Sequence, residues 1–394
     1  MFPVVKFYHS KTKRGNVKLK RFYMKDRETI LQFGGGKFLR SFADLFIDEA
    51  NSTGQDVGKI VVVQSTEGNR SELLNRQNGR YRVHIRGMQD GIEIDQIQEV
   101  ASVSRAMTIQ ADWEGILDVA TSPDLRIVLS NTTEIGYQVK AEDRLNPGIP
   151  HSFPARLLEL LLARFRAGGT PLTIVPCELI DNNADTLKQI IRDLALFKSY
   201  GHRFIDWMSK DTIWLNTLVD RITSDPPVDH PLREKDPLMT VTEPFALWVI
   251  QSSSRGEGLF DHEKITRSDD VRPYGLRKVR ILNGAHTALV CKAMPMGLET
   301  VRNAILNDEV KSWLLELLHN EIIPTIEDRV VDPVRFADAC IERFSNPFLV
   351  HKLASIAWEH DTKVQLRLAQ TYHEYISKFD RKPPILTDLV AQYI

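Results

Sequence analysis

The chain has 394 residues, which exceeds the size of one ordinary hydrophobic core and indicates two domains. Hydrophobic residues make up 42% and charged residues 26%, as in soluble globular proteins, and a formal net charge of -1 gives no field that would attract nucleic acid or an anionic membrane. The three cysteines, Cys177, Cys291 and Cys340, form no metal-ligand or disulfide spacing, so we expect no metal site and a reducing, cytoplasmic location.

The N-terminal segment, residues 1–28, is expected to form a basic leader. Residues 1–25 contain eight Lys or Arg and no Asp or Glu. A solvated, poorly ordered arm is the favoured interpretation, with nucleic-acid binding or organelle targeting as alternatives. No apolar run is long enough to span a bilayer, and no secretory segment is found, so we expect no membrane partner.

Four short apolar runs predict buried strands, at residues 29–33, 60–63, 127–129 and 172–175. Helical spacing of apolar residues predicts helices near 38–46, 157–165 and 187–197. Strands that alternate with helices and are apolar throughout indicate a parallel sheet covered on both faces. We therefore predict an α/β fold whose N-terminal domain is Rossmann-like, with a mainly parallel sheet.

The rest of the chain departs from this alternation. Residues 81–87 and 91–94 have period-two patterning and predict a hairpin inserted into the α/β domain. Residues 224–240 and 252–275 are rich in Pro, Asp, Ser and Arg and are predicted to be loops. Beyond these loops helical periods dominate. The predicted division is a Rossmann-like domain over 29–266 and a mainly α-helical domain over 267–394.

The glycine-rich turn after the first strand is the first candidate site. Its pattern is Gly34-x-Gly36, with Leu39 where a third glycine normally stands. Such glycines let the backbone approach a pyrophosphate, and a helix N-terminus offers unpaired N–H groups to its charge. A tight strand-to-helix turn would use the same residues, but the position after the first strand favours a nucleotide.

The residue that would hold the adenosine ribose is less clear. Gln64 ends the second strand and Glu67 follows it, so neither is a clear match to the expected acid. Arg70 lies close enough in the sequence to bind the 2′-phosphate of NADP. The pattern therefore leaves NADP open beside NAD.

Polar side chains also follow the third and fourth predicted strands. Asn131 and Thr132 come after the third, and Glu178 and Asp181 come after the fourth. In open α/β sheets ligands bind outside the carboxyl ends of the strands, so these groups are candidates for contact with a nicotinamide or a polyhydroxy chain. Capping of the following turns and helices is the alternative for each.

The third candidate site is Lys278-x4-Asn283-x2-His286. Asn283 and His286 are three residues apart and share a face if the segment is helical. A buried lysine can exchange a proton with a substrate oxygen near neutral pH, because burial disfavours its charged form. By spacing alone, an N-cap asparagine, a semi-buried histidine and a solvated lysine explain the same residues.

With these residues in view, the chain resembles the mannitol dehydrogenase family of polyol-specific long-chain dehydrogenases. The family's proton-transfer motif is Lys-x4-Asn-x2-His, here Lys278, Asn283 and His286. Further stretches that match in order are 32–40, 130–134, 176–181, 219–222, 281–289 and 343–347. The resemblance implies a Rossmann-like domain, a helical domain, a site in the cleft between them and no metal.

The resemblance is strongest to the branch that acts on D-tagaturonate. Asp220 matches a position near substrate and cofactor, and Lys363 matches a substrate-contacting lysine. Ser355 stands where mannitol-type members carry an arginine, which favours a keto sugar acid over a neutral ketose. The implied reaction is reversible NADH-dependent reduction of D-tagaturonate to D-altronate by a monomer or small homo-oligomer.

Pattern and resemblance together predict three groups of site residues. Lys278, Asn283 and His286 are the expected catalytic residues, and Glu178, Asp181, Asp220 and Lys363 the expected substrate ligands. The expected cofactor-binding residues are Phe33, Gly34, Gly35, Gly36, Lys37, Phe38, Gln64, Asn131 and Thr132. The alternatives are fructuronate reduction, mannitol or other polyol oxidation, and a nicotinamide-binding sensor without turnover.

Three departures from the family pattern accompany this resemblance. Lys37 replaces an asparagine beside the phosphate turn, where its charge suits a pyrophosphate. Asn182-Asn183-Ala184 replaces asparagine-glycine, with an altered turn expected. The sequence stops at Ile394, short of where these reductases usually end, so we expect a terminal helical segment to be missing, with an effect on stability rather than on chemistry.

Overall fold

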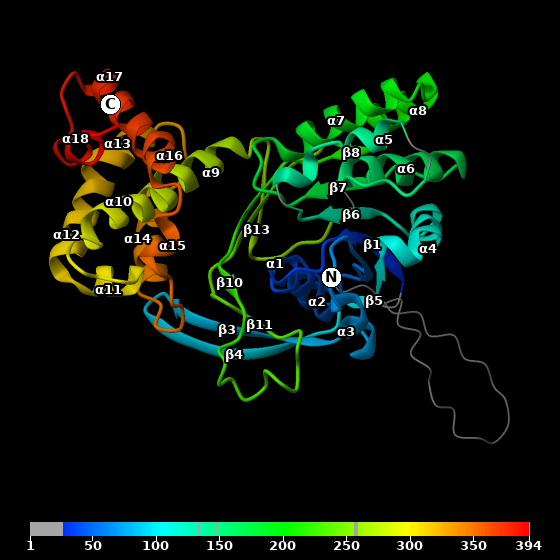
Figure 1. Cartoon of the computed structure of the whole chain (residues 1–394), viewed down its shortest axis with the longest axis horizontal. Helices are drawn as coiled ribbons and strands as arrows, with labels where there is room; N and C mark the ends of the chain where they lie inside the picture. Colours follow the sequence, from blue (N-terminus) through cyan, green and yellow to red (C-terminus); the bar gives the residue numbers. More distant parts are fainter. Residues whose placement is uncertain (1–26, 133, 146–147, 256–258, 394) are drawn as a thin grey trace, which may run out of the picture.

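The computed structural model describes residues 27–132, 134–145, 148–255 and 259–393. Two lobes are visible, a Rossmann-like lobe and a helical lobe drawn in yellow to red (Figure 1). The predicted basic leader lies outside the described residues, except for Arg27 and Glu28. In the described part of the chain, no helix combines the length and the apolar character that crossing a membrane requires.

The central sheet of the N-terminal lobe has six strands in the order β5-β2-β1-β6-β7-β8, all parallel. This is the strand order of a dinucleotide-binding domain. The predicted Rossmann-like fold is confirmed. The strands are β1 (Glu28–Phe33), β2 (Lys59–Gln64), β5 (Val103–Thr108), β6 (Ile127–Ser130), β7 (Thr173–Pro176) and β8 (Ile213–Trp214). The four predicted strands are present, whereas β5 and β8 were not predicted.

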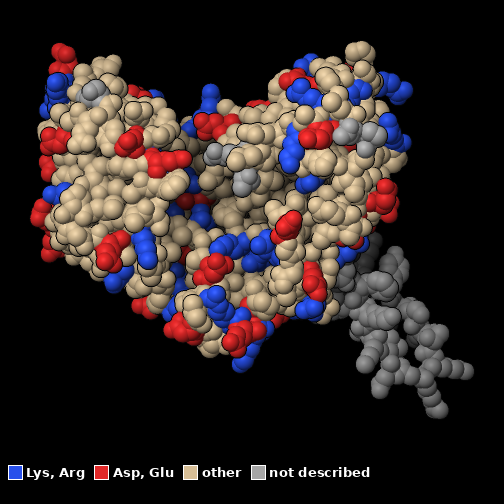
Figure 2. Space-filling view, viewed as in Figure 1, with Lys and Arg blue, Asp and Glu red and all other residues tan. Residues whose placement is uncertain are grey.

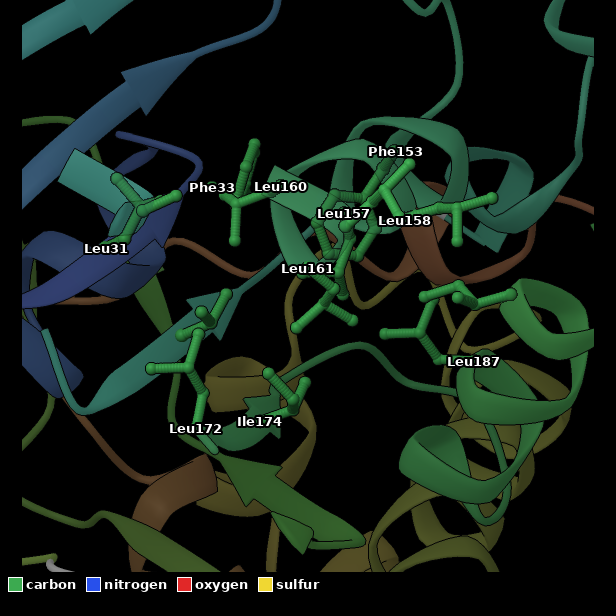
Figure 3. Close-up of a cluster of buried hydrophobic side chains, with 14 of the residues drawn as sticks. Leu31, Phe33, Phe153, Leu157, Leu158, Leu160, Leu161, Leu172, Ile174 and Leu187 are labelled. Atoms are coloured by element: carbon green, nitrogen blue, oxygen red, sulfur yellow. The ribbon is translucent and has the colours of Figure 1, made fainter. Parts of the chain in front are cut away.

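Both faces of this sheet are buried, since successive residues of a strand point to opposite faces and pack into different hydrophobic clusters. Leu31 and Phe33 of β1 pack with one hydrophobic cluster, and Ile30 packs with another. The first cluster is completed by α6 and α7, whose leucines meet the sheet from one side (Figure 3). The apolar runs therefore lack alternation for the reason expected of a sheet covered on both faces.

Helices connect and cover the strands. They are α1 (Lys37–Arg40), α2 (Ala43–Ser52), α3 (Arg70–Arg76), α4 (Ile109–Thr121), η2 (Glu134–Tyr137), α5 (Ala141–Leu145), α6 (Phe153–Arg166), α7 (Asn183–Phe197), α8 (His202–Asp206) and η3 (Trp207–Asp211). The helix predicted near 38–46 is broken at Phe42, whose φ and ψ are -131° and -95°. The Ser41 carbonyl at this break accepts a 2.7 Å hydrogen bond from Arg221.

Two smaller sheets join the lobes. One has the order β10-β11-β3-β4 and the other β13-β12-β9. The predicted hairpin is present as β3 (Tyr81–Gln89) and β4 (Ile92–Val100); the other strands are β9 (Thr217–Asp220), β10 (Thr223–Ser224), β11 (Thr240–Thr242), β12 (Leu247–Gln251) and β13 (Ile265–Ser268). The prediction of a loop over 252–275 is wrong at β13 and at the start of the following helix. The strand β13 was missed because it is only half-buried and contains no apolar run.

The C-terminal lobe is helical among its described residues and has its own hydrophobic core. Its elements are α9 (Arg272–Arg277), η4 (Lys278–Asn283), α10 (Gly284–Ala293), α11 (Val301–Leu306), α12 (Asp308–Glu316), η5 (Leu317–Ile322), α13 (Ile323–Ile326), α14 (Pro333–Phe344), α15 (Leu353–Ile356), α16 (His360–Val364), η6 (Gln365–Ala369), α17 (Gln370–Phe379) and α18 (Pro384–Val390). The tip of the β3–β4 hairpin reaches this lobe, where Glu342 accepts the backbone N–H groups of Asp90 and Gly91.

Candidate active site

A cavity of about 520 Å³ lies between the two lobes, in the hollow seen in Figure 2. Its lining combines residues of the Rossmann-like lobe with the first residue of η4: Phe38, Asn131, Thr132, Ile135, Leu179, Val219, Arg221 and Lys278. The structure thus brings the predicted proton donor into one cavity with three predicted cofactor ligands. Ile135, Leu179, Val219 and Arg221 were not predicted.

Lys278 is held at the cavity wall by the end of β9. Its Nζ donates a 2.8 Å hydrogen bond to the carbonyl of Val219 and lies 3.8 Å from Oδ1 of Asp220. The side chain of Lys278 is 15% exposed. An ammonium has three N–H donors, and these contacts leave part of that capacity for a ligand in the cavity.

The negative charge of Asp220 interacts with two cations, the buried Arg343 and the partly buried Lys278. Burial opposes its ionisation, but the charges of Arg343 and Lys278 outweigh burial and hold its pKa below the ordinary value. Arg343 donates to both carboxylate oxygens of Asp220 at 3.1 Å and also pairs with Glu243. Arg343 belongs to a stretch that matches the family. Its pairing with Asp220 was not predicted, because the two residues are 123 positions apart in the sequence.

The backbone between Lys278 and Asn283 is a π-helical turn, η4. In a π-helix each N–H bonds to the carbonyl five residues earlier. Lys278 and Asn283 are five residues apart, so this turn brings them nearer to one side of the helix, whereas an α-helix would direct them to different sides. The x4 spacing of the motif therefore has a structural explanation in the local widening of the helix.

His286 follows on α10 and is enclosed by the helical lobe. Its ring lies 4.5 Å from the ring of Phe344 and 5.0 Å from that of His351. Its Nε2 is buried and has no hydrogen-bond partner among the described residues. Burial, with the charge of His351 next in weight, lowers the pKa of His286 well below 6.5, so the imidazole is neutral at neutral pH.

The glycine-rich turn is built for a close approach of backbone. Gly34 has φ +114°, and a Cβ there would lie 3.0 Å from the carbonyl of Asn131. A Cβ at Gly35 would lie 3.1 Å from Val62. A Cβ at Gly36 would meet nothing within 4 Å, so the last glycine faces open space. The turn is therefore closely packed at Gly34 and Gly35 and open at Gly36.

The loop after β2 is organised by Gln64. Its amide donates to the carbonyls of Thr66 and Gly68, each at 2.8 Å, and accepts from the N–H of Ser71 at 2.7 Å. These contacts fix the conformation of the loop that follows β2. Arg70 reaches back to the turn, with its Cδ 3.4 Å from a Cβ built on Gly35.

Three other predicted cofactor-binding residues, Lys37, Asn131 and Phe33, lie in different surroundings. Lys37 pairs with Asp225 at 2.6 Å across the turn, on the surface. Asn131 donates to the carbonyl of Cys177 at 2.7 Å and so joins the ends of β6 and β7. Phe33 is fully buried in the core below the turn.

The four predicted substrate ligands lie in different settings. Glu178 is buried, and its carboxylate accepts from Ser130, the N–H of Thr132 and Tyr137, so it anchors the end of β6. Burial raises its pKa. Asp181 is exposed and does not line the cavity. Of the four, only Asp220 lies within ion-pair distance of Lys278.

Lys363 lies on α16, in the helical lobe. Its Nζ donates to the carbonyls of Ile356, at 3.0 Å, and Trp358. It has no acidic partner among the described residues. The structure thus gathers Lys278, Asn283, His286 and Asp220 on neighbouring elements, and Lys363 on a helix that continues into η6, which packs against η4 and α10.

Comparisons with known proteins agree with this architecture. The model of the mannitol dehydrogenase Rossmann domain matches residues 28–263, and that of the mannitol dehydrogenase C-terminal domain matches residues 270–394. In the described residues no group of three or more His, Cys, Asp or Glu could hold a metal.

Curated relatives named altronate oxidoreductase are similar over most of the chain. The chain is 32% identical to that of Halalkalibacterium halodurans, over 97% of this chain and 77% of the relative. It is 35% identical to those of Bacillus subtilis, over 92% and 78%, and Klebsiella pneumoniae, over 93% and 79%.

Solved structures share the fold at lower identity. A substrate-free D-sorbitol dehydrogenase has a TM-score of 0.82 at 24% identity, with 95% of this chain and 81% of that chain covered. The Pseudomonas fluorescens mannitol 2-dehydrogenase complex with NAD and D-mannitol has a TM-score of 0.77 at 21% identity, with 94% and 80% covered. Together, the two domain matches, the relatives and the shared fold show that the chain is an oxidoreductase of the mannitol dehydrogenase family.

Proposed function

We propose that the chain catalyses the reversible reduction of D-tagaturonate to D-altronate with NADH, a reaction of hexuronate catabolism. The observation that carries the proposal is the position of Lys278, whose ammonium lines one cavity together with Asn131 and Thr132. Similarity to altronate oxidoreductases in two bacilli and in Klebsiella supports the choice of substrate. The proposed reaction agrees with the broader role of a dehydrogenase that acts on polyols and sugar acids.

The residues around the glycine-rich turn fit a nicotinamide dinucleotide. Gly36 faces open space, which suits a pyrophosphate, and Gln64 fixes the loop beside the ribose position. Phe38, Ile135 and Leu179 give the cavity apolar walls that suit a nicotinamide ring. When bound, the reduced cofactor supplies the hydride.

Lys278 is the proposed proton donor to the oxygen of the keto group. Asp220 lies 3.8 Å from the ammonium, and the Val219 carbonyl accepts a hydrogen bond from it and fixes its direction. Proton transfer by a positioned group contributes roughly a hundred- to ten-thousandfold in rate. In the oxidative direction the same nitrogen accepts the proton from the substrate hydroxyl.

Asn283 and His286 are the proposed partners of Lys278. The π-helical turn supports this role for Asn283, because it brings positions 278 and 283 nearer to one side of the helix, and its amide is the proposed donor to the same substrate oxygen. A donor of this kind is worth about a hundred- to a thousandfold in rate. His286 has a neutral ring with an unpartnered Nε2, which suits a hydrogen bond to a substrate hydroxyl.

A substrate panel tests this function. The full chain is assayed for oxidation of NADH or NADPH with D-tagaturonate, D-fructuronate and D-fructose at neutral pH. We expect NADH consumption to be fastest with D-tagaturonate. Consumption with D-fructose alone would instead identify a neutral ketose as the substrate, and cofactor binding without turnover on any substrate would favour a sensor.

A further inference from the structure

The strand β2 ends in an amide, at the place where a domain that is specific for NAD carries a carboxylate. In such domains an Asp or Glu about 20 residues after the glycine-rich turn binds the ribose 2′-hydroxyl, whereas a nearby Arg accommodates the 2′-phosphate of NADP. Gln64 is the last residue of β2 and is only 4% exposed. Both N–H donors of its amide are used by loop carbonyls, and its oxygen accepts from Ser71. Gln64 therefore neither repels a phosphate nor has a free donor for the ribose.

Glu67 is the first carboxylate along the loop that follows β2. Its side chain is exposed and makes no hydrogen bond or ion pair with the part of the chain that the structure describes. A solvent-exposed charge without a fixed geometry contributes little binding energy. Glu67 should therefore discriminate only weakly between a ribose hydroxyl and a ribose phosphate.

Arg70 is positioned beside the glycine-rich turn. Gln64 accepts the N–H of the next residue, Ser71, at 2.7 Å, which fixes the start of α3 at the carboxyl end of β2. The stem of Arg70 lies against the turn, since its Cδ is 3.4 Å from the position that a Cβ on Gly35 would take. Burial lowers the pKa of Arg40, and the nearby charge of Arg70 lowers it further. The positive charge of Arg70 therefore acts at the turn where a dinucleotide would bind.

The guanidinium of Arg70 is available to a ligand. The arginines that follow it in the sequence pair with carboxylates: Arg76 with Glu72 at 2.5 Å, and Arg80 with Glu99 at 2.6 Å. Arg70 is partly exposed and makes no ion pair or side-chain hydrogen bond within the described ranges of the chain. Its five N–H donors, together with its position at the end of β2, suit an anion on the adenosine side of the turn.

We propose that Arg70 binds the 2′-phosphate of NADPH, so that the chain accepts NADPH as well as NADH. The proposal rests on the proposed function only in requiring a nicotinamide dinucleotide at the glycine-rich turn. A guanidinium binds a phosphate through parallel charge-assisted hydrogen bonds. Because Gln64 replaces the acid that would repel this phosphate, the free energy gained at Arg70 is not offset by a fixed negative charge.

A purely structural role for Arg70 predicts a different result. If its stem only supports Gly35, loss of the guanidinium should change the affinities for NADH and NADPH equally, because the two dinucleotides share the pyrophosphate. If Arg70 binds the 2′-phosphate, the loss should fall mainly on ligands that carry this phosphate. The ratio of the two dissociation constants therefore separates the two roles.

The variants are Arg70→Met, which keeps the packing stem without the charge, and Arg70→Lys, which keeps the charge without the planar fork. Arg76→Met is the matched control, because Arg76 is an exposed arginine of the same helix α3. The Kd values for NADPH and NADH are measured by calorimetry on each full-length protein, without sugar. Adenosine 2′,5′-bisphosphate and 5′-AMP form a second pair of probes that differ only in the 2′-phosphate.

We expect the wild type to bind NADPH with a Kd within about tenfold of that for NADH. Arg70→Met should raise the ratio of the NADPH Kd to the NADH Kd roughly 10- to 100-fold, with the same trend for the adenosine probes. Arg70→Lys should recover part of this loss, and Arg76→Met should leave the ratio unchanged.

Failure of the wild type to bind NADPH, or an equal loss of both dinucleotides in Arg70→Met, would overturn the proposal. Because binding is measured without a sugar, the outcome is separate from the proposed reaction. A chain that binds NADPH through Arg70 but does not reduce D-tagaturonate would refute that reaction and support the 2′-phosphate site.

Discussion

The ammonium of Lys278 lies 3.8 Å from a carboxylate oxygen of Asp220; the carboxylate is buried and the lysine side chain is partly buried beside it. Asp220 is the link between the lobes at this point, because it ends β9 and also binds Arg343 of α14. The proton donor and a main inter-lobe ion pair therefore share one carboxylate. Changes at Asp220 should affect both rate and stability.

Replacing Asp220 with asparagine should lower stability and kcat together. Arg343 keeps Glu243 as a partner, so we expect a loss of about 2–3 kcal/mol in the free energy of unfolding, at the low end for breaking a buried pair. Because the folded-state pKa of Asp220 is below 3.8, this contribution is present above that pH and is lost as the pH falls through the folded value.

Urea denaturation of the wild type and Asp220→Asn at pH 7 and pH 3 measures this effect. Asp225→Asn is the control, because Asp225 pairs with Lys37 on the surface and its side chain is 69% exposed. A smaller difference in the free energy of unfolding between wild type and Asp220→Asn at pH 3 than at pH 7 is the expected outcome. Equal stabilities at pH 7 would contradict the role given to Asp220.

Replacing Gly36 with alanine should weaken nucleotide binding without destabilising the fold. Gly36 has φ -66° and ψ 165°, which alanine adopts freely, and the added Cβ meets no protein atom within 4 Å. The methyl group instead occupies the space proposed for the pyrophosphate, so we expect the Kd for NADH to rise about tenfold or more.

Gly201→Ala is a matched control for Gly36→Ala. Gly201 also precedes a helix, has φ -61° and ψ 148°, and faces open space. Fluorescence titration with NADH and thermal unfolding of both variants give the comparison. Unchanged NADH affinity in Gly36→Ala would refute the proposed pyrophosphate position.

Asp44 should make stability fall as the pH rises toward neutral. Burial raises its pKa from 3.8 to about 7, against hydrogen bonds from Gln32 and Tyr81. A raised carboxyl pKa gives stability that is fully present below the unfolded value and is lost as the pH climbs through the folded value. The loss between pH 4 and pH 8 is on the order of 3 kcal/mol.

Asp44→Asn keeps the acceptor for the Tyr81 hydroxyl but cannot ionise. The variant should therefore gain stability relative to the wild type as the pH rises from 5 to 8, as measured by denaturation at each pH. A constant difference between the two proteins over this range would show that Asp44 does not titrate there.

The sequence was informative where apolar patterning is strong. The buried runs of β1, β2, β6 and β7 and the amphipathic α6 and α7 were predicted, because each contributes to a continuous core. β5 was missed because Ser104 and Arg105 interrupt its apolar residues. β13 was missed for a similar reason, since its four residues are all half-buried.

The candidate site was predictable in its motif but not in its contacts. The spacing of Lys278, Asn283 and His286 and their resemblance to a known family identified the helical segment. The pairing of Lys278 with Asp220, and of Asp220 with Arg343, joins distant parts of the chain. No residue preference in the sequence predicts the π-helical turn of η4.

Lys278→Ala tests the proposed chemistry most directly. Turnover of D-tagaturonate and affinity for NADH are measured on the same preparation. Lys292→Ala is the control, because Lys292 lies on the neighbouring α10 and pairs with Glu309 of α12. We expect kcat to fall roughly a hundred- to ten-thousandfold in Lys278→Ala, with the NADH Kd within about twofold of the wild type. Near-normal turnover in Lys278→Ala would contradict the assignment of Lys278 as the proton donor.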